Sequence, residues 1–272
     1  MSVLLHISDT HFGTDEPPVA QALRALAREQ APHALVLSGV ITQRARSAQF
    51  AAARAFCDSL GIDRMLALPG NHDIPLYNVV ARAFYPYAGY TAAFGADLEP
   101  VLALDDLLVI GVNTTRPHRH KDGEVSPKQV ARVEGLLRRA APGQLRVVVT
   151  HQPACVMRPE DEKDRLHGGE AALQAWSAAG ADLVLGGHIH LPYVADLCAR
   201  APAAPRPTYC VQAGTAVSHR VRHGTPNSIN LVRWSAPLPG VTRTCAVERW
   251  DYDLADSRFE RTHEHVLQLG TV

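Results

Sequence analysis

Histidine, aspartate and asparagine gather in short motifs that each follow an apolar run: "HISDTHF", "LPGNHD", "VTHQP" and "LGGHIH". Imidazole nitrogen combined with carboxylate and amide oxygen suits borderline divalent ions such as Mn²⁺, Fe or Zn²⁺ and suits Ca²⁺ poorly. Six or more such donors exceed the needs of one tetrahedral zinc, so the pattern predicts a centre of two ions. The candidate residues are Asp9, His11, Asn71, His72, Asp73, His151, His188 and His190.

Short apolar runs predict the strands that carry these motifs. They are rich in Val and Leu and do not alternate with polar residues, which is typical of strands buried on both faces. Ala-rich segments with helical spacing lie between several of them, at 19–29, 48–60, 127–140 and 170–179. Alternating strands and helices favour an α/β layered domain. The predicted strands span 3–7, 34–38, 64–68, 107–112, 146–150 and 182–187.

The motifs stand at the carboxyl ends of predicted strands, the edge at which open α/β sheets place their sites. Asp9 and His11 are two residues apart, and so are His188 and His190. In an extended segment, residues i and i+2 point to the same side. We therefore expect each pair to present two side chains to one common place.

The pattern changes after about residue 192, where four predicted strands follow one another without helices between them, at 208–214, 228–234, 242–252 and 258–265. We expect residues 193–272 to complete the second sheet rather than to form a separate domain. Residues 1–272 would then be a single domain, a length at which one chain buries a substantial core. The terminal strands could pair with those of a second copy, so a homo-oligomer is one of the possible states.

The composition indicates which classes of binding partner and which cell compartment to expect. Lys plus Arg and Asp plus Glu both number 27, so the formal net charge is zero. Such a balance gives no electrostatic reason to expect nucleic acid or an anionic membrane surface. The 5 cysteines are scattered and odd in number, which argues against a disulfide framework. With no signal-peptide core and no membrane-length apolar stretch, we expect a cytoplasmic protein.

The ordered set of motifs over residues 5–191 resembles the calcineurin-like metallophosphoesterase family. The resemblance rests on Asp9-x-His11, Gly39 after a strand, Gly70-Asn71-His72-Asp73, a lone His151 after a strand, and Gly187-His188-x-His190. Two further stretches, "DGEVSPKQVARVEGLL" (122–137) and "PNSINLV" (226–232), are similar to the bacterial class III cyclic-nucleotide phosphodiesterase branch.

The resemblance implies a four-layer α/β/β/α sandwich of two mixed sheets flanked by helices, the metallo-dependent phosphatase fold. It implies metal-dependent hydrolysis of phosphodiesters, with cyclic nucleotides such as cAMP as candidate substrates. Asp9, His11 and His190 would hold the first ion, and Asn71, His151 and His188 the second. His72 would be the catalytic group that binds the phosphate or protonates the leaving oxygen. Asp73 would orient His72 by accepting its other N–H.

Val40 departs from the family pattern, in which an aspartate after Gly39 would bridge both ions. A shared carboxylate screens the repulsion between two dications, and valine supplies neither charge nor lone pair. Residues 38–42 are Ser, Gly, Val, Ile and Thr, so no neighbour in this turn replaces it. Three readings stay open: an inactivated form of an enzyme, an enzyme with weak or single-ion binding and slow activity, or a natural non-catalytic member.

Competing functions share the same fold. A nuclease needs a basic groove to bind nucleic acid, and the neutral net charge disfavours one. A phosphomonoesterase is barely distinguished by sequence from a phosphodiesterase. A non-catalytic scaffold gains support from Val40 and loses it from the intact ligand set. "RPHRH" (116–120), with His118 and His120, is either a solvated loop or a phosphate-binding patch. "PEDEKDR" (159–165) is either an exposed loop or a lid.

Overall fold

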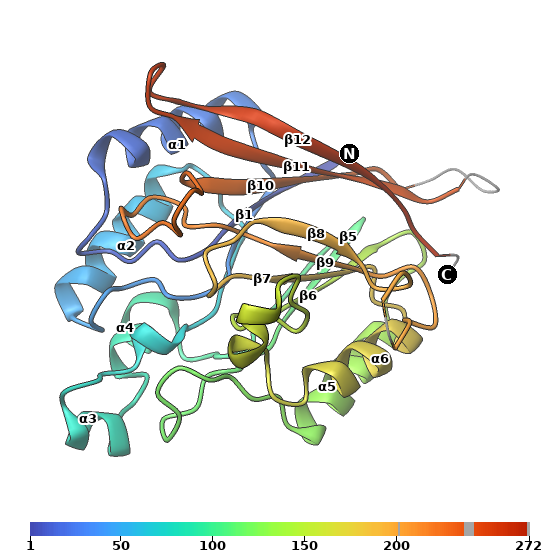
Figure 1. Cartoon of the computed structure of the whole chain (residues 1–272), viewed down its shortest axis with the longest axis horizontal. Coiled ribbons are helices and arrows are strands. Elements are labelled where there is room, and N and C mark those ends of the chain that lie inside the picture. The colour runs from blue at the N-terminus through green and yellow to red at the C-terminus, as the bar shows by residue number, and fades with distance from the viewer. Residues whose placement is uncertain (201, 237–241, 271–272) are drawn as a thin grey trace.

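A computed structural model describes residues 1–200, 202–236 and 242–270, and in this part of the chain two six-stranded mixed sheets lie face to face (Figure 1). The first sheet has the order β12-β11-β10-β1-β2-β3, with β1 Ser2–Ile7, β2 Ala34–Leu37, β3 Met65–Ala67, β10 Ser228–Trp234, β11 Thr244–Asp253 and β12 Arg258–Gln268. The second has the order β4-β5-β6-β7-β9-β8, with β4 Val101–Leu104, β5 Leu107–Gly111, β6 Leu145–Val149, β7 Leu183–Gly186, β8 Tyr193–Asp196 and β9 Tyr209–Gln212.

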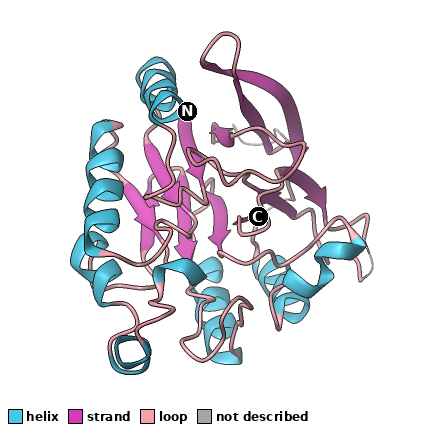
Figure 2. Cartoon of the chain, turned by 60° about the vertical axis from the view of Figure 1, so that its left-hand side comes forward, coloured by secondary structure: helices cyan, strands magenta, loops and turns pink. Residues whose placement is uncertain are grey.

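Helices cover the outer faces of both sheets (Figure 2). Two short 3₁₀ helices, η1 and η2, lie in loops that follow β3 and β6. No helix among the described residues is both long and apolar enough to cross a membrane. The helices are α1 Pro17–Gln30, α2 Ser47–Ser59, α3 Val79–Phe84, α4 Ala88–Phe94, α5 Pro127–Arg138 and α6 Gly169–Ala179, with η1 Asn71–Asp73 and η2 Pro159–Asp164.

Three apolar clusters separate the four layers. In β2, Leu35 packs into the cluster formed with α1 and α2, whereas its neighbour Val36 packs into the cluster between the two sheets. In β6, Val147 joins that middle cluster and Val148 joins the cluster with α5 and α6. Because successive strand residues point to opposite faces, non-alternating apolar strands are buried on both sides. The predicted α/β/β/α sandwich is therefore confirmed.

The ends of two predicted helices are fixed by local sequence. Ser126 caps α5 by accepting a hydrogen bond from the Gln129 N–H at 3.3 Å, and Pro127 follows at the first helical position. α6 ends at Gly180, whose φ of +110° is costly for other residues. In contrast, α3 and α4 were not predicted. α3 has no buried residue and α4 buries Tyr90 alone, so neither short helix needs the apolar periodicity by which a longer helix is recognised.

The C-terminal strands divide between the sheets. β8 and β9 join the second sheet, but β10, β11 and β12 extend the first sheet beyond β1 (Figure 1). The prediction that residues 193–272 complete the second sheet is therefore wrong for these last three strands. β10 pairs antiparallel with β1, where Leu231 and Val232 fill the clusters on opposite faces of the first sheet. Residues 201, 237–241 and 271–272 of that span lie outside the described part.

Parallel pairing sets where the motifs meet. β1, β2 and β3 are parallel neighbours in the first sheet, and β5, β6, β7 and β9 are parallel neighbours in the second. Strands that run in one direction end at the same edge of a sheet. The loops after β1, β2, β3, β6 and β7 therefore open at a common edge of the two packed sheets.

Candidate metal centre

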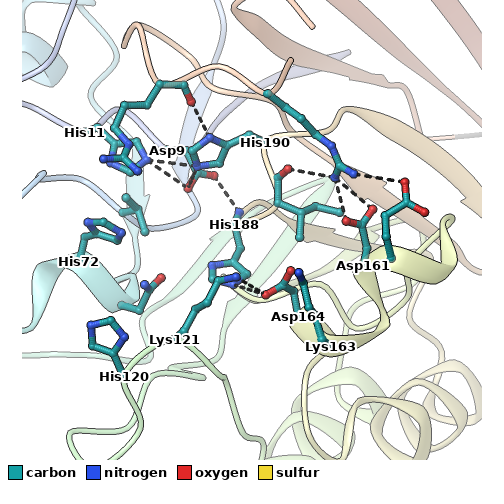
Figure 3. A pocket seen from close by; sticks show the side chains of 16 residues that line it. Asp9, His11, His72, His120, Lys121, Asp161, Lys163, Asp164, His188 and His190 are labelled. Carbon is teal, nitrogen blue, oxygen red and sulfur yellow. Dashed lines mark hydrogen bonds and ion pairs between the residues drawn. The ribbon is translucent and has the colours of Figure 1, made fainter. Parts of the chain in front are cut away.

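These loops surround a cavity of about 430 Å³ (Figure 3). The predicted residues Asp9, His11, Asn71, His72, His188 and His190 all line it. His151 is fully buried and reaches the same place through its contacts with Asn71 and His188. The structure thus brings every predicted ligand together. The other lining residues are Val40, His120, Lys121, Glu160, Asp161, Lys163, Asp164, Ile189, Arg220 and Arg222.

Asp9, His11 and His190 form the first group of donors, with ligand atoms that all lie within 4.8 Å of one another. His11 Nε2 lies 3.2 Å from His190 Nε2 and 3.9 Å from Asp9 Oδ1. Asp9 Oδ1 lies 3.3 Å from His190 Nε2. Donors that are each about 2.0–2.2 Å from a shared ion are at most about 4.4 Å apart. The three atoms therefore fit one divalent ion.

Asn71, His151 and His188 form the second group. Asn71 Oδ1 lies 3.2 Å from His151 Nε2, and the rings of His151 and His188 meet edge to face with centroids 5.1 Å apart. The two groups are joined through Asp9, whose Oδ2 accepts the backbone N–H of His188 at 2.8 Å. The carboxylate of the first group thus positions a ligand of the second.

The histidine rings are oriented by their Nδ1 atoms. His151 Nδ1 lies 2.9 Å from the Ser38 carbonyl oxygen, and His190 Nδ1 lies 2.5 Å from the Arg220 carbonyl oxygen. A carbonyl only accepts, so both Nδ1 atoms carry a hydrogen, which leaves Nε2 as the atom that would bind a metal. His11 Nδ1 contacts Gln43 Oε1 at 2.9 Å in the same way. Such outer hydrogen bonds are typical of histidines that bind metals.

The protonation states favour cation binding. Burial lowers the pKa of His11 to about 2, against the opposing charge of Asp9, and burial lowers the pKa of His151 and His188 as well. Burial also acts to raise the pKa of Asp9, but the neighbouring histidines, His190 first, hold that pKa below its ordinary value. At His190 burial acts to lower the pKa, but the charge of Asp9 and the hydrogen bonds to Asp9 and Arg220 raise it above its ordinary value. The centre therefore offers an ionised carboxylate and neutral rings at His11, His151 and His188 near neutral pH, and an ion at the first group would compete with a proton on His190.

Two buried polar atoms have no hydrogen-bond partner among the described residues at this centre: Asp9 Oδ1 and His188 Nε2. Leaving a buried polar group unpaired costs about 1–3 kcal/mol, so native structures rarely do it without a reason. Both atoms belong to predicted ligands, and a cation would satisfy both. The donor set, its spacing and these unpaired atoms together fit a divalent metal centre.

The side chains converge through turns, not through extended strands as predicted. Asp9, His11, His188 and His190 have φ values of +52°, +44°, +73° and +56°. This left-handed region is uncommon for residues other than glycine, and strain of this kind, about 1–3 kcal/mol per residue, clusters at functional sites. Each pair does converge as predicted, but left-handed turns bring the two side chains together, not an extended backbone.

Two glycines make room for the ligands. A Cβ at Gly39 would lie 2.5 Å from His151 Nδ1, and a Cβ at Gly187 would lie 2.6 Å from Asp9 Oδ2. Both distances are shorter than real Cβ contacts allow. The glycines before Val40 and His188 therefore let a backbone from one sheet approach a ligand from the other.

Asp73 does not orient His72, so that prediction is wrong. His72 Nδ1 contacts the Gln43 carbonyl oxygen at 3.1 Å. The Asp73 carboxylate instead accepts the backbone N–H groups of Ile41, Thr42 and Gly70 at 2.8–2.9 Å. Burial raises the pKa of Asp73 to about 6, against these hydrogen bonds. Asp73 is buried behind the turn that carries Val40, and its role is to hold that turn.

Val40 lines the same cavity as the two ligand groups. Its side chain is buried, and its φ is +48°. A β-branched residue in the left-handed region is a genuine outlier, whereas Asp and Asn are enriched there. The backbone of the turn also holds the first group, because Val40 O accepts the N–H of His11 at 3.1 Å. The turn has the shape for an acidic residue but carries valine.

Several residues of the cavity were missed by sequence reasoning. Gln43 contacts His11 through its side chain and His72 through its carbonyl, and no pattern marked it. Arg220 and Lys121 also line the cavity without having been singled out. Of the two histidines in "RPHRH", His120 lines the cavity, and His118 is not among the lining residues. The 159–165 segment, for which a lid was one interpretation, contains η2, and four η2 residues line the cavity.

This chain is similar in structure to several solved proteins. No curated protein matches it in a sequence search. Among solved structures, a dimetal phosphatase from Danio rerio is 12% identical over 99% of each chain, with a TM-score of 0.66. A purple acid phosphatase from yellow lupin (Lupinus luteus) seeds is 10% identical over 98% of this chain and 53% of that one, with a TM-score of 0.71. Vps29 from Entamoeba histolytica, solved with Zn²⁺, is 11% identical over 97% of this chain and 98% of that one, with a TM-score of 0.51.

At these identities the structural likenesses show the fold alone. The family comparison goes further, because a model described as calcineurin-like phosphoesterase matches residues 2–192, which include every predicted ligand. The match agrees with the donor groups, the two packed sheets and the layer order described above. The chain therefore belongs to the calcineurin-like phosphoesterase family.

Proposed function

We propose that this protein is a phosphodiesterase with a centre for two divalent ions, Mn²⁺, Fe or Zn²⁺, and that Val40 impairs its activity. The observation that carries the proposal is the pairing of two donor groups in one cavity. Asp9, His11 and His190 would hold the first ion, and Asn71, His151 and His188 the second. Divalent ions supply Lewis acidity toward phosphoryl oxygens and lower the pKa of a bound water.

The protein's own groups bind and orient the phosphate ester. Arg220 and Lys121 line the cavity and offer positive charge to phosphate oxygens. His72 is the proposed catalytic residue. Its ring meets that of His11 edge to face at 5.1 Å, and its Nδ1 is held by the Gln43 carbonyl. With Nδ1 fixed, Nε2 is the atom that protonates or stabilises the departing oxygen.

A substrate with a large leaving group is favoured by a second cavity, of about 690 Å³, that adjoins the first. The two cavities share Asn71, His72 and His120 as lining residues, and the second is also lined by Tyr77 and Tyr85. A leaving group as large as a nucleoside, with an aromatic base, would occupy this space once its phosphate is at the metal centre. A phosphomonoester of a small alcohol would leave it unfilled. Cyclic AMP is therefore the first substrate to test.

The test compares this chain with Val40→Asp and, as a matched control, Val40→Asn. Mn²⁺-dependent hydrolysis of bis-p-nitrophenyl phosphate is measured for all three, with bound metal counted in each. The Asp form should hydrolyse the diester faster than the natural chain, whereas Asn, which has the same shape but no charge, should not. A Val40→Asp protein that is loaded with two ions and inert would refute the proposal. Cyclic AMP and p-nitrophenyl phosphate, assayed beside the diester, decide the substrate class.

A second candidate function is a metal-binding scaffold without catalysis. Val40 is the observation that favours it, since the uncharged turn leaves the ions without a shared carboxylate. The structural likeness to Vps29 solved with Zn²⁺ shows only that this fold and a bound ion occur together in another protein. The scaffold predicts metal binding by this chain with no diester turnover by either the natural chain or Val40→Asp.

A further inference from the structure

We propose that Asp164, at the end of η2, supplies the carboxylate that position 40 lacks and binds the second ion together with His188. The inference rests on the proposed function, because it presupposes a cation at Asn71, His151 and His188. With Asp164 as a ligand, the metal centre of this chain has one more carboxylate than the ligand set proposed above. The second negative charge comes from η2, which lines the same cavity as Val40.

The distance from Asp164 to His188 fits a shared ion. Asp164 Oδ1 lies 4.0 Å from His188 Nε2, below the limit of about 4.4 Å for two donors on one ion. The side chains of Asp164 and His188 are only 10% and 5% exposed. His188 Nε2 is one of the buried atoms without a hydrogen-bond partner in the described part of the chain. Figure 3 shows Asp164 and His188 approaching each other at the rim of the cavity.

Lys121 forms an ion pair with Asp164, so its ammonium group lies where a metal ion would contact the carboxylate. Its Nζ lies 2.6 Å from Asp164 Oδ1, and its side chain is 53% exposed. A long, solvated lysine can leave a carboxylate at low cost when a divalent ion takes its place. Ion binding would then exchange one cation for another at Asp164 and release Lys121 toward the phosphate of the substrate.

The other acidic residues of η2 are engaged elsewhere. Asp161 accepts two hydrogen bonds from Arg222 Nη1, at 2.9 and 3.0 Å, and Glu160 Oε1 lies 3.7 Å from Arg222 Nη2. Arg222 Nη1 also donates to the carbonyl of Ile189, between the ligands His188 and His190, at 3.4 Å. This contact ties η2 to the loop of the ligands. Asp164 is thereby held beside His188, while Asp161 and Glu160 neutralise an arginine.

A structural role for the Lys121–Asp164 ion pair is the alternative, and it makes an opposite prediction for one variant. If the pair only fastens η2, then Asp164→Asn and Lys121→Gln should both weaken the fold of the cavity rim and change ion binding in the same direction. If Asp164 is a ligand, Lys121 competes with the ion. Lys121→Gln should then tighten ion binding, whereas Asp164→Asn should weaken it.

The experiment measures Mn²⁺ binding by equilibrium dialysis and by electron paramagnetic resonance, with no assay of activity. Asp164→Asn should weaken the second Mn²⁺ site at least about tenfold, because the loss of groups around a metal commonly costs 10–100-fold in affinity. Glu162→Gln is the matched control. It removes the same charge from η2, but Glu162 pairs with Arg165 at 3.1 Å and does not line the cavity. This control should bind Mn²⁺ as the natural chain does.

The Asp164→Asn variant is also measured in the Val40→Asp protein, which makes a double-mutant cycle. There a carboxylate is present at position 40, so Asp164→Asn should cost less affinity than in the natural chain, and the two effects should not add. An equal loss in both backgrounds, or two ions bound unchanged by Asp164→Asn, would overturn the inference. Weaker binding by Lys121→Gln would overturn it too. Each of these results is compatible with an active Val40→Asp enzyme, whereas a loaded but inert Val40→Asp refutes the proposed function instead.

Discussion

Asp73 and Thr42 are joined by two hydrogen bonds of 2.8 Å, because Asp73 Oδ1 accepts both the backbone N–H and the hydroxyl of Thr42. Asp73 Oδ2 accepts the N–H groups of Ile41 and Gly70. One carboxylate thus links the loop after β3 to the turn after β2. Since Val40 lies in that turn, the shape of the metal centre depends on a residue that touches no predicted ligand side chain in the described contacts.

Replacing Asp73 should destabilise the fold. Asp73→Ala leaves three buried backbone N–H groups without an acceptor, each worth about 1–3 kcal/mol, so the free energy of unfolding should fall by about 3 kcal/mol or more. Asp73→Asn keeps one carbonyl acceptor, so its free energy of unfolding should lie between those of Asp73→Ala and the natural chain. Thermal and urea unfolding of metal-free protein measures both. An Asp73→Ala protein as stable as the natural chain would contradict this role.

Divalent ions should stabilise the natural chain against heat. A ligand at one hundred times its Kd adds about 2.7 kcal/mol, which for a chain of this size raises the unfolding midpoint by about 5–10 °C. The expected result is a rise with Mn²⁺ that a chelator reverses. Asp9→Asn, which keeps the shape of the side chain and removes its charge, should lose most of the rise. If Asn in place of Asp9 left the rise intact, the first ion would lie elsewhere.

His72→Gln should slow the reaction without removing the ions. General acid catalysis contributes about 10²–10⁴-fold, so the Val40→Asp, His72→Gln protein should lose roughly that much in kcat relative to Val40→Asp. The loss should be larger for alkyl leaving groups than for p-nitrophenol, which needs little protonation. His120→Gln, on the same cavity, is the control and should lose less. A similar loss for both leaving groups would point to phosphate binding instead of proton donation.

Glu248 should stabilise the fold only above acidic pH. Burial acts to raise its pKa, but hydrogen bonds from Arg233, Trp250 and Arg261 lower it below the ordinary value. A carboxyl whose folded pKa is depressed adds stability above its unfolded pKa of about 4.5, and that stability is lost as the pH falls through the folded pKa.

Glu248→Gln should therefore lower the free energy of unfolding by about 1–3 kcal/mol at pH 7 and by less at pH 3. Denaturant unfolding at the two pH values measures the difference. Glu264→Gln is the control, because Glu264 pairs with Arg261 at 3.2 Å on the exposed surface and should contribute almost nothing. A Glu248→Gln effect that is constant between pH 3 and pH 7 would exclude the charged form as its source.

The sequence by itself determined the layers and the kinds of donor. Val36 and Val147 lie in short non-alternating apolar runs, which are typical of strands buried on both faces. Asp9, Asn71 and His151 each lie in the loop that follows such a strand, and the parallel strands of each sheet end at one edge. Their convergence therefore followed from patterns a few residues long, since strand burial and donor chemistry are local properties.

Tertiary structure alone decided what each donor contacts. Asp73 neighbours His72 in sequence but binds the turn at Ile41 and Thr42, and Gln43 orients His11 across a gap of 32 positions. Asp164 Oδ1 lies 4.0 Å from His188 Nε2, although the two residues belong to different loops. These partners are fixed by packing between segments distant along the chain, and by left-handed turns whose strain that packing offsets. Neither the packing partners nor the left-handed turns can be predicted from the local spacing of residues.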